Sequence, residues 1–192
     1  MNQIDLTLEL DEHRWSAAVQ QGTIAACGHL GTHLDTMEKE FPLDYLSLPG
    51  VIFDVSHLRQ GDVKVEDIDQ NSVRQGSCVL FFTDSIGRFQ YGTEEYARQH
   101  TQLSPDVAEL LIVRRVKMIG LDAAGIRRGV EHKPMDQYCA DNGVFVVENL
   151  VNLGSLLMAT RGRPFIVRTF PLKLKGATGL PCRVVAEIGE SD

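Results

Sequence analysis

The sequence lacks the features that mark membrane, nucleic-acid-binding and redox-motif proteins. No apolar run approaches the ~20 residues that a helix needs to span a bilayer, so we expect no membrane partner. Basic residues are scarce: 19 Lys and Arg stand against 26 Asp and Glu, which gives a formal net charge of −7. Because binding to phosphates needs clustered Lys and Arg, this balance argues against a nucleic-acid partner.

Cysteines are few, and none of them form a C-x-x-C motif. The four thiols are scattered along the chain and no signal peptide is evident, which predicts reduced cysteines in a cytoplasmic protein: Cys27, Cys78, Cys139 and Cys182. A glycine-rich phosphate loop, a dinucleotide fingerprint and a Ser–His–Asp signature are also missing from the sequence. A length of 192 residues suits one well-cored domain and is short for two, so we expect a single domain over residues 1–192.

Short apolar runs alternate with helical patterns, which predicts a mixed α/β fold with sheet-and-helix layers in a single domain. The clearest helix start is 104–106, where a capping Ser precedes Pro and Asp; this helix should end near residue 115. Two further helices are expected over 64–73 and 149–160. Strands are expected over 3–10, 50–56, 77–83, 116–121, 143–147, 165–172 and 181–188.

The most informative stretch runs from His29 to Asp35 and contains two histidines, an aspartate, a glycine and a threonine. Imidazole and carboxylate together suit zinc, manganese or iron(II). In an α-helix, His29 and His33 would share a face but Asp35 would point away from it. In an extended segment all three side chains project to one side, although a straight strand would hold the histidines about 13 Å apart. The spacing therefore favours an extended segment that bends at Gly31.

This stretch resembles the opening of the H-x-G-T-H-x-D-x-P-x-H signature of the cyclase family of metal-dependent hydrolases, which includes bacterial kynurenine formamidase and isatin hydrolase. A second region, from His132 through Glu148 to Asn149-Leu-Val-Asn152-Leu, resembles the distal half of the same family. In that family a histidine and a later acidic residue before N-L-x-N-L complete the metal centre. The resemblance thus implies five metal ligands: His29, His33, Asp35, His132 and Glu148.

One departure from the signature affects its catalytic part. The final P-x-H of the signature falls on Met37 and Lys39, and in the family that histidine transfers protons during hydrolysis. A lysine amine normally stays protonated to about pH 10, whereas a nearby cation and burial would favour its neutral form. Lys39 is therefore either a catalytic base or a solvated side chain in a charged run. In the second case, Glu38 or a metal-activated water assisted by Glu148 would supply the base.

The resemblance also implies the fold, the reaction and the partners. The expected fold is the swivelling β/α/β-like fold of the cyclase family. One ion, or a close pair sharing Asp35, would lower the pKa of a water molecule and polarise an amide, formamide or lactam carbonyl, as in an arylformamidase. Zinc is the first expectation for the metal and manganese the second. The expected partners are a small-molecule carbonyl substrate and further copies of the chain, in a homodimer or homotetramer.

Two other classes stay open at this point. The chain could bind the metal but have lost or altered catalysis, because Lys39 replaces the signature histidine. It could also be a lyase or isomerase that uses the metal to stabilise an enolate, since a fold does not by itself determine the reaction.

Overall fold

The computed structural model describes residues 2–12, 16, 20, 28–59 and 61–189, and it has the mixed α/β fold that the sequence predicts. Of the four cysteines, Cys78, Cys139 and Cys182 are buried and have free thiols, whereas Cys27 lies outside the described residues. None of the described helices is long and apolar enough to cross a membrane.

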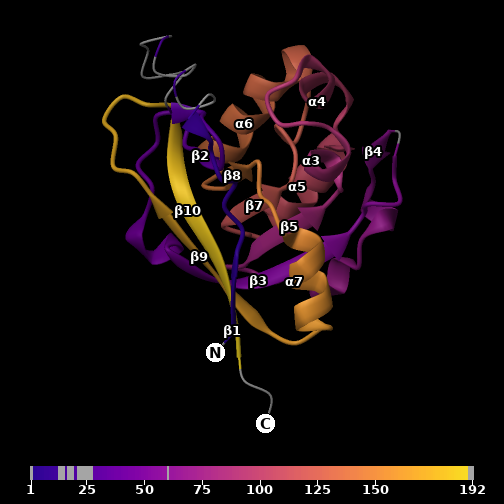
Figure 1. The fold of residues 1–192 in the computed structure, drawn as a ribbon. Helices are drawn as coiled ribbons and strands as arrows, with labels where there is room; N and C mark the ends of the chain where they lie inside the picture. Colours follow the sequence, from indigo (N-terminus) through magenta and orange to yellow (C-terminus); the bar gives the residue numbers. More distant parts are fainter. Residues whose placement is uncertain (1, 13–15, 17–19, 21–27, 60, 190–192) are drawn as a thin grey trace.

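One eight-stranded sheet organises the molecule (Figure 1), in the order β1-β10-β2-β8-β7-β5-β3-β9. Strand β9 pairs with both β3 and β10, so seven of these strands close into a barrel-like ring and β1 adds to β10. A separate pair joins β4 (Asp62–Val63) to β6 (Gln102–Leu103). The strands of the large sheet are β1 (Asn2–Asp5), β2 (His33–Asp35), β3 (Ser47–Asp54), β5 (Cys78–Phe82), β7 (Met118–Leu121), β8 (Phe145–Glu148), β9 (Phe165–Pro171) and β10 (Gly179–Ile188).

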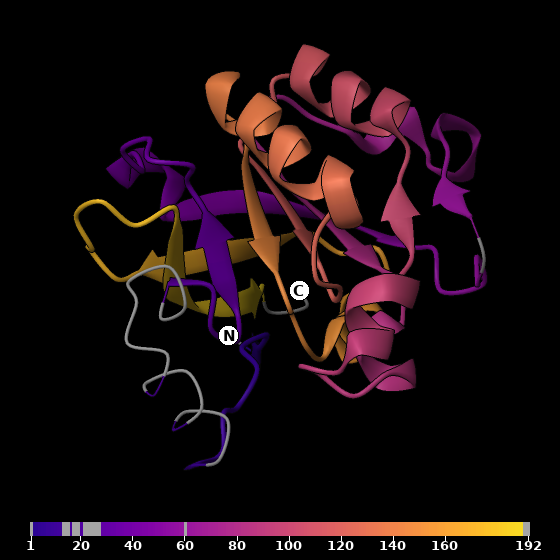
Figure 2. The ribbon, with the colours of Figure 1, turned by 90° about the horizontal axis from the view of Figure 1, so that it is seen from above.

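Helices lie on both faces of the parallel strands β3, β5, β7 and β8. Figure 2 shows α5 and α6 over one face, and α7 lies on the opposite side, near β3 and β5 (Figure 1). The helices are α3 (Ser85–Arg88), α4 (Glu94–Gln99), α5 (Pro105–Val113), α6 (His132–Asp141) and α7 (Leu153–Thr160), with 3-10 turns η1 (Leu43–Tyr45), η2 (Val65–Asp67), η3 (Gln70–Ser72) and η4 (Gly129–Glu131).

The alternation of side chains along the central strands divides the interior into two cores. In β5, Val79 and Phe81 point to the core beneath α5 and α6, whereas Cys78 and Leu80 point to the core that contains α7, β9 and β10. Successive side chains of a strand face opposite sides, so a strand buried on both faces is apolar throughout. This explains why the central strands are continuous apolar runs in the sequence.

The predicted strands are confirmed, although β1 ends at Asp5 rather than at residue 10. The predicted helix start is confirmed by α5, because the Ser104 hydroxyl accepts a hydrogen bond from the backbone N–H of Val107. The predicted helix over 64–73 is wrong: η2 and η3 form instead, because the side chains of Asp67 and Asp69 accept hydrogen bonds from nearby backbone N–H groups.

Two helical boundaries near the later metal-ligand candidates also differ from the prediction. Helix α7 begins at Leu153, four residues late, because Asn149 and Asn152 adopt left-handed φ values of 57° and 61°. Helix α6 was not predicted, and it begins at His132, which gives this histidine a helical position.

Candidate metal centre

The bend predicted at Gly31 is confirmed. Gly31 has a φ of +62°, a conformation that glycine adopts readily, and β2 begins two residues later at His33. As a result Nδ1 of His29 lies 3.1 Å from Nε2 of His33, although a straight strand would separate these residues by about 13 Å. His33 and Asp35 then project from the same side of β2, as alternate residues of a strand do.

Asn149 and Thr32 hold this bend in place. The Thr32 hydroxyl donates to the Asn149 carbonyl at 2.7 Å and accepts from the backbone N–H of Leu8 at 2.8 Å. The side-chain amide of Asn149 donates to the carbonyl of Gly31 at 2.9 Å. Asn149 is therefore a structural residue of the site, and its place directly after Glu148 in the N-L-x-N-L segment was the available signal for it.

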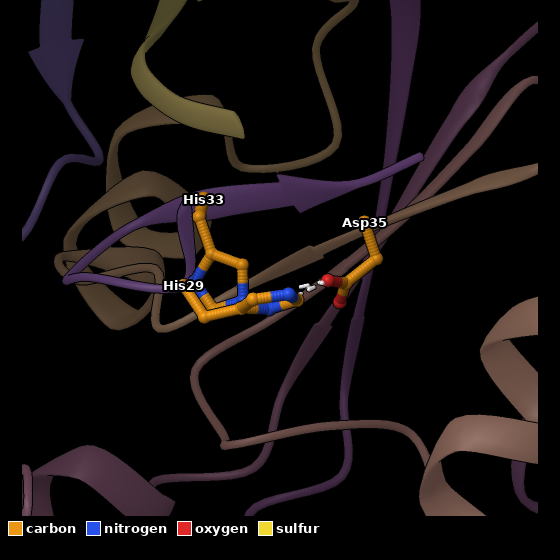
Figure 3. Close-up of side chains that lie close together, drawn as sticks. All are labelled: His29, His33 and Asp35. Carbon is orange, nitrogen blue, oxygen red and sulfur yellow. Dashed lines mark hydrogen bonds and ion pairs between the residues drawn. The ribbon is translucent and has the colours of Figure 1, made fainter. Parts of the chain in front are cut away.

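The first cluster consists of His29, His33 and Asp35, whose side chains converge at the start of β2 (Figure 3). Nδ1 of His29 lies 3.0 Å from Oδ1 of Asp35, and Nε2 of His33 lies 3.6 Å from the same oxygen. The other nitrogen of each ring is engaged: His29 Nε2 lies 3.0 Å from the Thr178 hydroxyl, and His33 Nδ1 lies 2.9 Å from the Gly31 carbonyl. Both rings are thus oriented by neighbours outside the cluster, as metal-binding histidines usually are.

The second cluster shares Asp35 with the first and adds His132, Asp136 and Glu148. Strands β2 and β8 are antiparallel neighbours in which His33 stands opposite Glu148, so Glu148 Oε2 lies 3.4 Å from His33 Nε2. Nε2 of His132 lies 2.8 Å from Glu148 Oε1 and 3.1 Å from Asp136 Oδ2. The structure therefore brings all five residues of the predicted ligand set together in two adjoining clusters.

Asp136 is the ligand candidate that the sequence analysis missed. It follows His132 by four residues on α6, so the two side chains share one face of the helix and meet. The H-x-x-x-D spacing was visible in the sequence, but it indicates a shared site only once the segment is known to be helical.

The residues present fit a cation. The Gly31 carbonyl can only accept a hydrogen bond, so Nδ1 of His33 carries the proton and a neutral His33 turns its Nε2 lone pair toward the carboxylates of Asp35 and Glu148. Neither oxygen of Asp35, nor Oδ1 of Asp136, accepts a hydrogen bond of normal geometry from any described residue, although all three atoms are buried. Such atoms are costly to bury without a partner, and a cation among them would satisfy lone pairs and negative charge together.

Burial and mutual repulsion set the protonation states of the site. Burial lowers the pKa of His33, which keeps its imidazole neutral. Burial, followed by the charge of Asp35, raises the pKa of Glu148 well above its usual range, and burial raises that of Asp136 to about 6. Hydrogen bonds to Asp136 and Glu148 raise the pKa of His132 to about 11. Asp136 and Glu148 therefore lie where their ionised forms need additional positive charge, whereas the contacts of Asp35 with His33 and His29 outweigh its burial and lower its pKa.

Lys39 lies away from this centre. Its amine forms an ion pair with Asp141 at the end of α6, and the Lys39 side chain is 46% exposed. It lines a groove between residues 36–46 and 171–180, not the cavity beside the histidines. A catalytic role for Lys39 stays a prediction, and the position of the side chain does not support it.

A cavity of about 570 Å³ opens beside the two clusters. Four of the ligand candidates, His29, His33, His132 and Glu148, are among its lining residues. The described lining also includes residues of α4 and around it and of the segment before η4, among them Tyr91, Tyr96, Arg98 and Arg128. The candidate metal ligands therefore face a space that admits a small molecule.

Comparisons with known proteins bear on the family and the fold of the chain. The family model described as cyclase matches residues 4–127, a range that includes the first cluster and stops before the second is complete. No curated protein matches the chain. A solved structure described as a potential metal-dependent hydrolase with cyclase activity is 24% identical over 99% of both chains, with a TM-score of 0.74.

Two further solved structures have the same fold. A predicted metal-dependent hydrolase from Bacillus stearothermophilus is 22% identical, over 96% of this chain and 97% of its own, with a TM-score of 0.70. Isatin hydrolase A from Labrenzia aggregata, bound to benzyl benzoate, is 20% identical, over 98% of this chain and 94% of its own, with a TM-score of 0.75. At these identities the likeness is one of fold.

Proposed function

The chain belongs to the cyclase family, and on this premise we propose that it is a metal-dependent hydrolase of amides, formamides or lactams, in the manner of an arylformamidase. One observation carries the proposal: two clusters that suit a metal share the buried Asp35 and border a single cavity. The histidine-and-carboxylate set suits both zinc and manganese, and zinc is proposed first because imidazole, which three of the candidates supply, is one of its usual ligands. The homodimer or homotetramer implied by the resemblance stays a prediction.

In the proposed reaction, the residues of the site have different roles. A divalent cation held by His29, His33, Asp35, His132, Asp136 and Glu148 would lower the pKa of a water molecule and polarise the substrate carbonyl. The contact from His33 Nδ1 to the Gly31 carbonyl keeps Nε2 available as a ligand atom. Glu148, which lines the cavity, is the proposed acceptor of the proton from the attacking water, at a carboxylate oxygen.

Elemental analysis together with a turnover assay tests this function. Protein purified without a metal-affinity tag should contain one or two zinc or manganese ions per chain and should hydrolyse formanilide or a small lactam. Removal of the metal with a chelator should lower turnover by about a hundredfold or more, because several kcal/mol of transition-state stabilisation would be lost, and added metal should restore it.

The alternatives predict different results in the same assays. Protein that binds zinc or manganese tightly yet turns over no carbonyl substrate would favour the metal-binding protein with lost or altered catalysis. A metal-free wild type that also fails to take up added zinc or manganese would overturn the hydrolase proposal.

Replacement of Lys39 by alanine should leave kcat/KM within about twofold of the wild-type value, because its half-exposed amine is paired with Asp141 outside the cavity. Exposed ion pairs contribute about 0–1 kcal/mol to stability, so the Lys39→Ala variant should also fold normally. Asp141→Asn removes the partner charge and serves as the matched control. A tenfold or larger loss confined to Lys39→Ala would make Lys39 the catalytic replacement for the signature histidine.

A further inference from the structure

The backbone groups of Gly31, at the bend between the two histidines, are all hydrogen-bonded to side chains. The Gly31 N–H donates to the Tyr91 hydroxyl at 2.7 Å. The Gly31 carbonyl accepts from Nδ1 of His33 and from Nδ2 of Asn149, each at 2.9 Å. A carbonyl oxygen has two lone pairs, so these contacts use the whole hydrogen-bonding capacity of the bend. The three side chains therefore determine where the Gly31 carbonyl lies relative to His33.

Tyr96 sets the direction of the Asn149 amide. The Gly31 carbonyl can only accept, so the nitrogen of the amide faces Gly31 and the oxygen faces Tyr96. The Tyr96 hydroxyl donates to this oxygen at 2.7 Å, and Tyr96 and Asn149 are only 2% and 3% exposed. A buried acceptor without a donor is costly, so loss of the hydroxyl would favour a turned amide that no longer binds the Gly31 carbonyl.

The segment that carries both tyrosines is itself anchored. Tyr91 precedes α4 and Tyr96 lies within it, with the two rings 6.0 Å apart in an edge-to-face arrangement. The Tyr96 N–H donates to the Thr93 hydroxyl at 3.2 Å, and the Tyr96 carbonyl accepts from Nδ1 of the buried His100 at 3.1 Å. A helix of six residues is marginal by itself, so its position depends on such contacts. The two hydroxyls are thereby held at fixed positions.

The ring proton of His33 has two competing acceptors. With the proton on Nδ1, the ring donates to the Gly31 carbonyl and turns the Nε2 lone pair toward Asp35 and Glu148. With the proton on Nε2, the ring would donate to these carboxylates, whose oxygens lie 3.6 and 3.4 Å away, and Nε2 could not bind a metal. The position of the Gly31 carbonyl therefore decides whether Nε2 is available as a ligand atom.

We propose that Tyr91 and Tyr96 are positioning residues of the metal centre. Tyr91 holds the Gly31 N–H. Tyr96 holds the Gly31 carbonyl through Asn149. Together they keep this carbonyl on Nδ1 of His33, so that the Nε2 lone pair faces the metal site. This inference rests on the proposed metal-dependent function, because it gives the two hydroxyls a role in metal binding.

Zinc affinity measures the role of each hydroxyl. Tyr91→Phe and Tyr96→Phe should each weaken the Kd for zinc about threefold to tenfold, the range for loss of one hydrogen bond, in a competition assay with a chromophoric chelator. Tyr45→Phe is the matched control, because Tyr45 is only 8% exposed and its hydroxyl accepts from Nζ of Lys117 at 2.7 Å. Tyr45 belongs to neither cluster and does not line the cavity, so its replacement should leave the Kd within about twofold of the wild-type value.

The tautomer of His33 gives a second readout that needs neither metal nor turnover. In the metal-free wild type, NMR of the imidazole nitrogens should show the proton on Nδ1. In Tyr91→Phe and in Tyr96→Phe the share of the Nε2–H tautomer should rise, because the Gly31 carbonyl is held less firmly and the carboxylates compete for the proton. A variant that is merely less stable keeps the wild-type tautomer, as Tyr45→Phe should. If Tyr96→Phe fails to fold, Tyr91→Phe decides, since Tyr91 is only half-buried.

The outcomes separate this inference from the function on which it rests. A zinc Kd within about twofold of the wild-type value in both tyrosine variants would overturn the role of the two hydroxyls. A wild type that binds neither zinc nor manganese would count against the proposed function, and the tautomer of His33 would then decide the positioning role by itself. Equal tautomer populations in the wild type and in both variants would overturn that role.

Discussion

Replacement of Asp35 by asparagine is expected to abolish metal binding at both clusters and to lower kcat/KM by about a thousandfold or more. Asp35 is the one residue that the two clusters share, and both of its oxygens lie buried without a normal hydrogen-bond donor. An amide of the same size keeps the shape of the side chain but removes the charge, so several kcal/mol of transition-state stabilisation would be lost, at tenfold in rate per 1.36 kcal/mol.

The measurement is metal content per chain, read together with unfolding in urea with and without zinc. Removal of the Asp35 charge has two opposing effects on the metal-free protein. It relieves repulsion, because this charge helps to raise the pKa values of Glu148 and Asp136, but it also removes the contacts with His33 and His29 that outweigh burial and lower the pKa of Asp35. Urea unfolding without zinc measures the balance of the two and gives the baseline for the effect of zinc. In the wild type, zinc at a hundredfold excess over Kd should add about 2.7 kcal/mol to the free energy of unfolding, and this gain should vanish in Asp35→Asn.

Two further variants make the Asp35→Asn result specific. Asp136→Asn affects only the second cluster, so it should retain the ion held by His29, His33 and Asp35. Asp141→Asn changes an exposed carboxylate that is paired with Lys39 and should bind metal as the wild type does. Full metal occupancy in Asp35→Asn would show that the two clusters do not depend on their common residue.

The first cluster was predictable from the sequence because its geometry is local. The three ligand residues lie within seven positions, so only the backbone conformation between them has to be predicted. Gly31 indicates that conformation, since glycine permits the left-handed bend observed at φ +62°. Glu148 was also predictable as a ligand from the sequence. It follows an apolar run and therefore lies at a strand end, where α/β folds place their sites.

The second cluster depends on long-range pairing that no local pattern encodes. Glu148 meets His33 because β2 inserts antiparallel beside β8, a contact between residues 115 positions apart. Asp136 meets His132 because the segment is helical, and this segment is too polar to show a clear helical period in its sequence. The separation of Lys39 from the metal centre also has a backbone cause: Met37 and Glu38 have left-handed φ values, and they turn the chain away from the centre after β2.

Replacement of Phe81 by alanine should lower the free energy of unfolding by about 3–5 kcal/mol, the range for removal of a buried aromatic ring. Phe81 is completely buried in the central strand β5, in the core beneath α5 and α6, with its ring 5.7 Å from that of Phe53. Urea denaturation should show a lower midpoint with an unchanged slope, because the loss is one of packing and not of compactness.

Phe170 provides the matched control, since it is also a phenylalanine in a strand of the sheet but is 51% exposed. Phe170→Ala should change the free energy of unfolding by about 0.5 kcal/mol or less. Equal losses in the two variants would mean that β5 does not lie at the centre of the core.

Zinc should partly or fully offset the loss in Phe81→Ala, because β2, β8 and α6 carry metal ligands and belong to the same sheet-and-helix assembly. At a thousandfold excess over Kd, zinc should add about 4.1 kcal/mol to the free energy of unfolding of this variant. A variant that zinc does not stabilise, although it binds the ion, would show that the metal centre can form without the folded core.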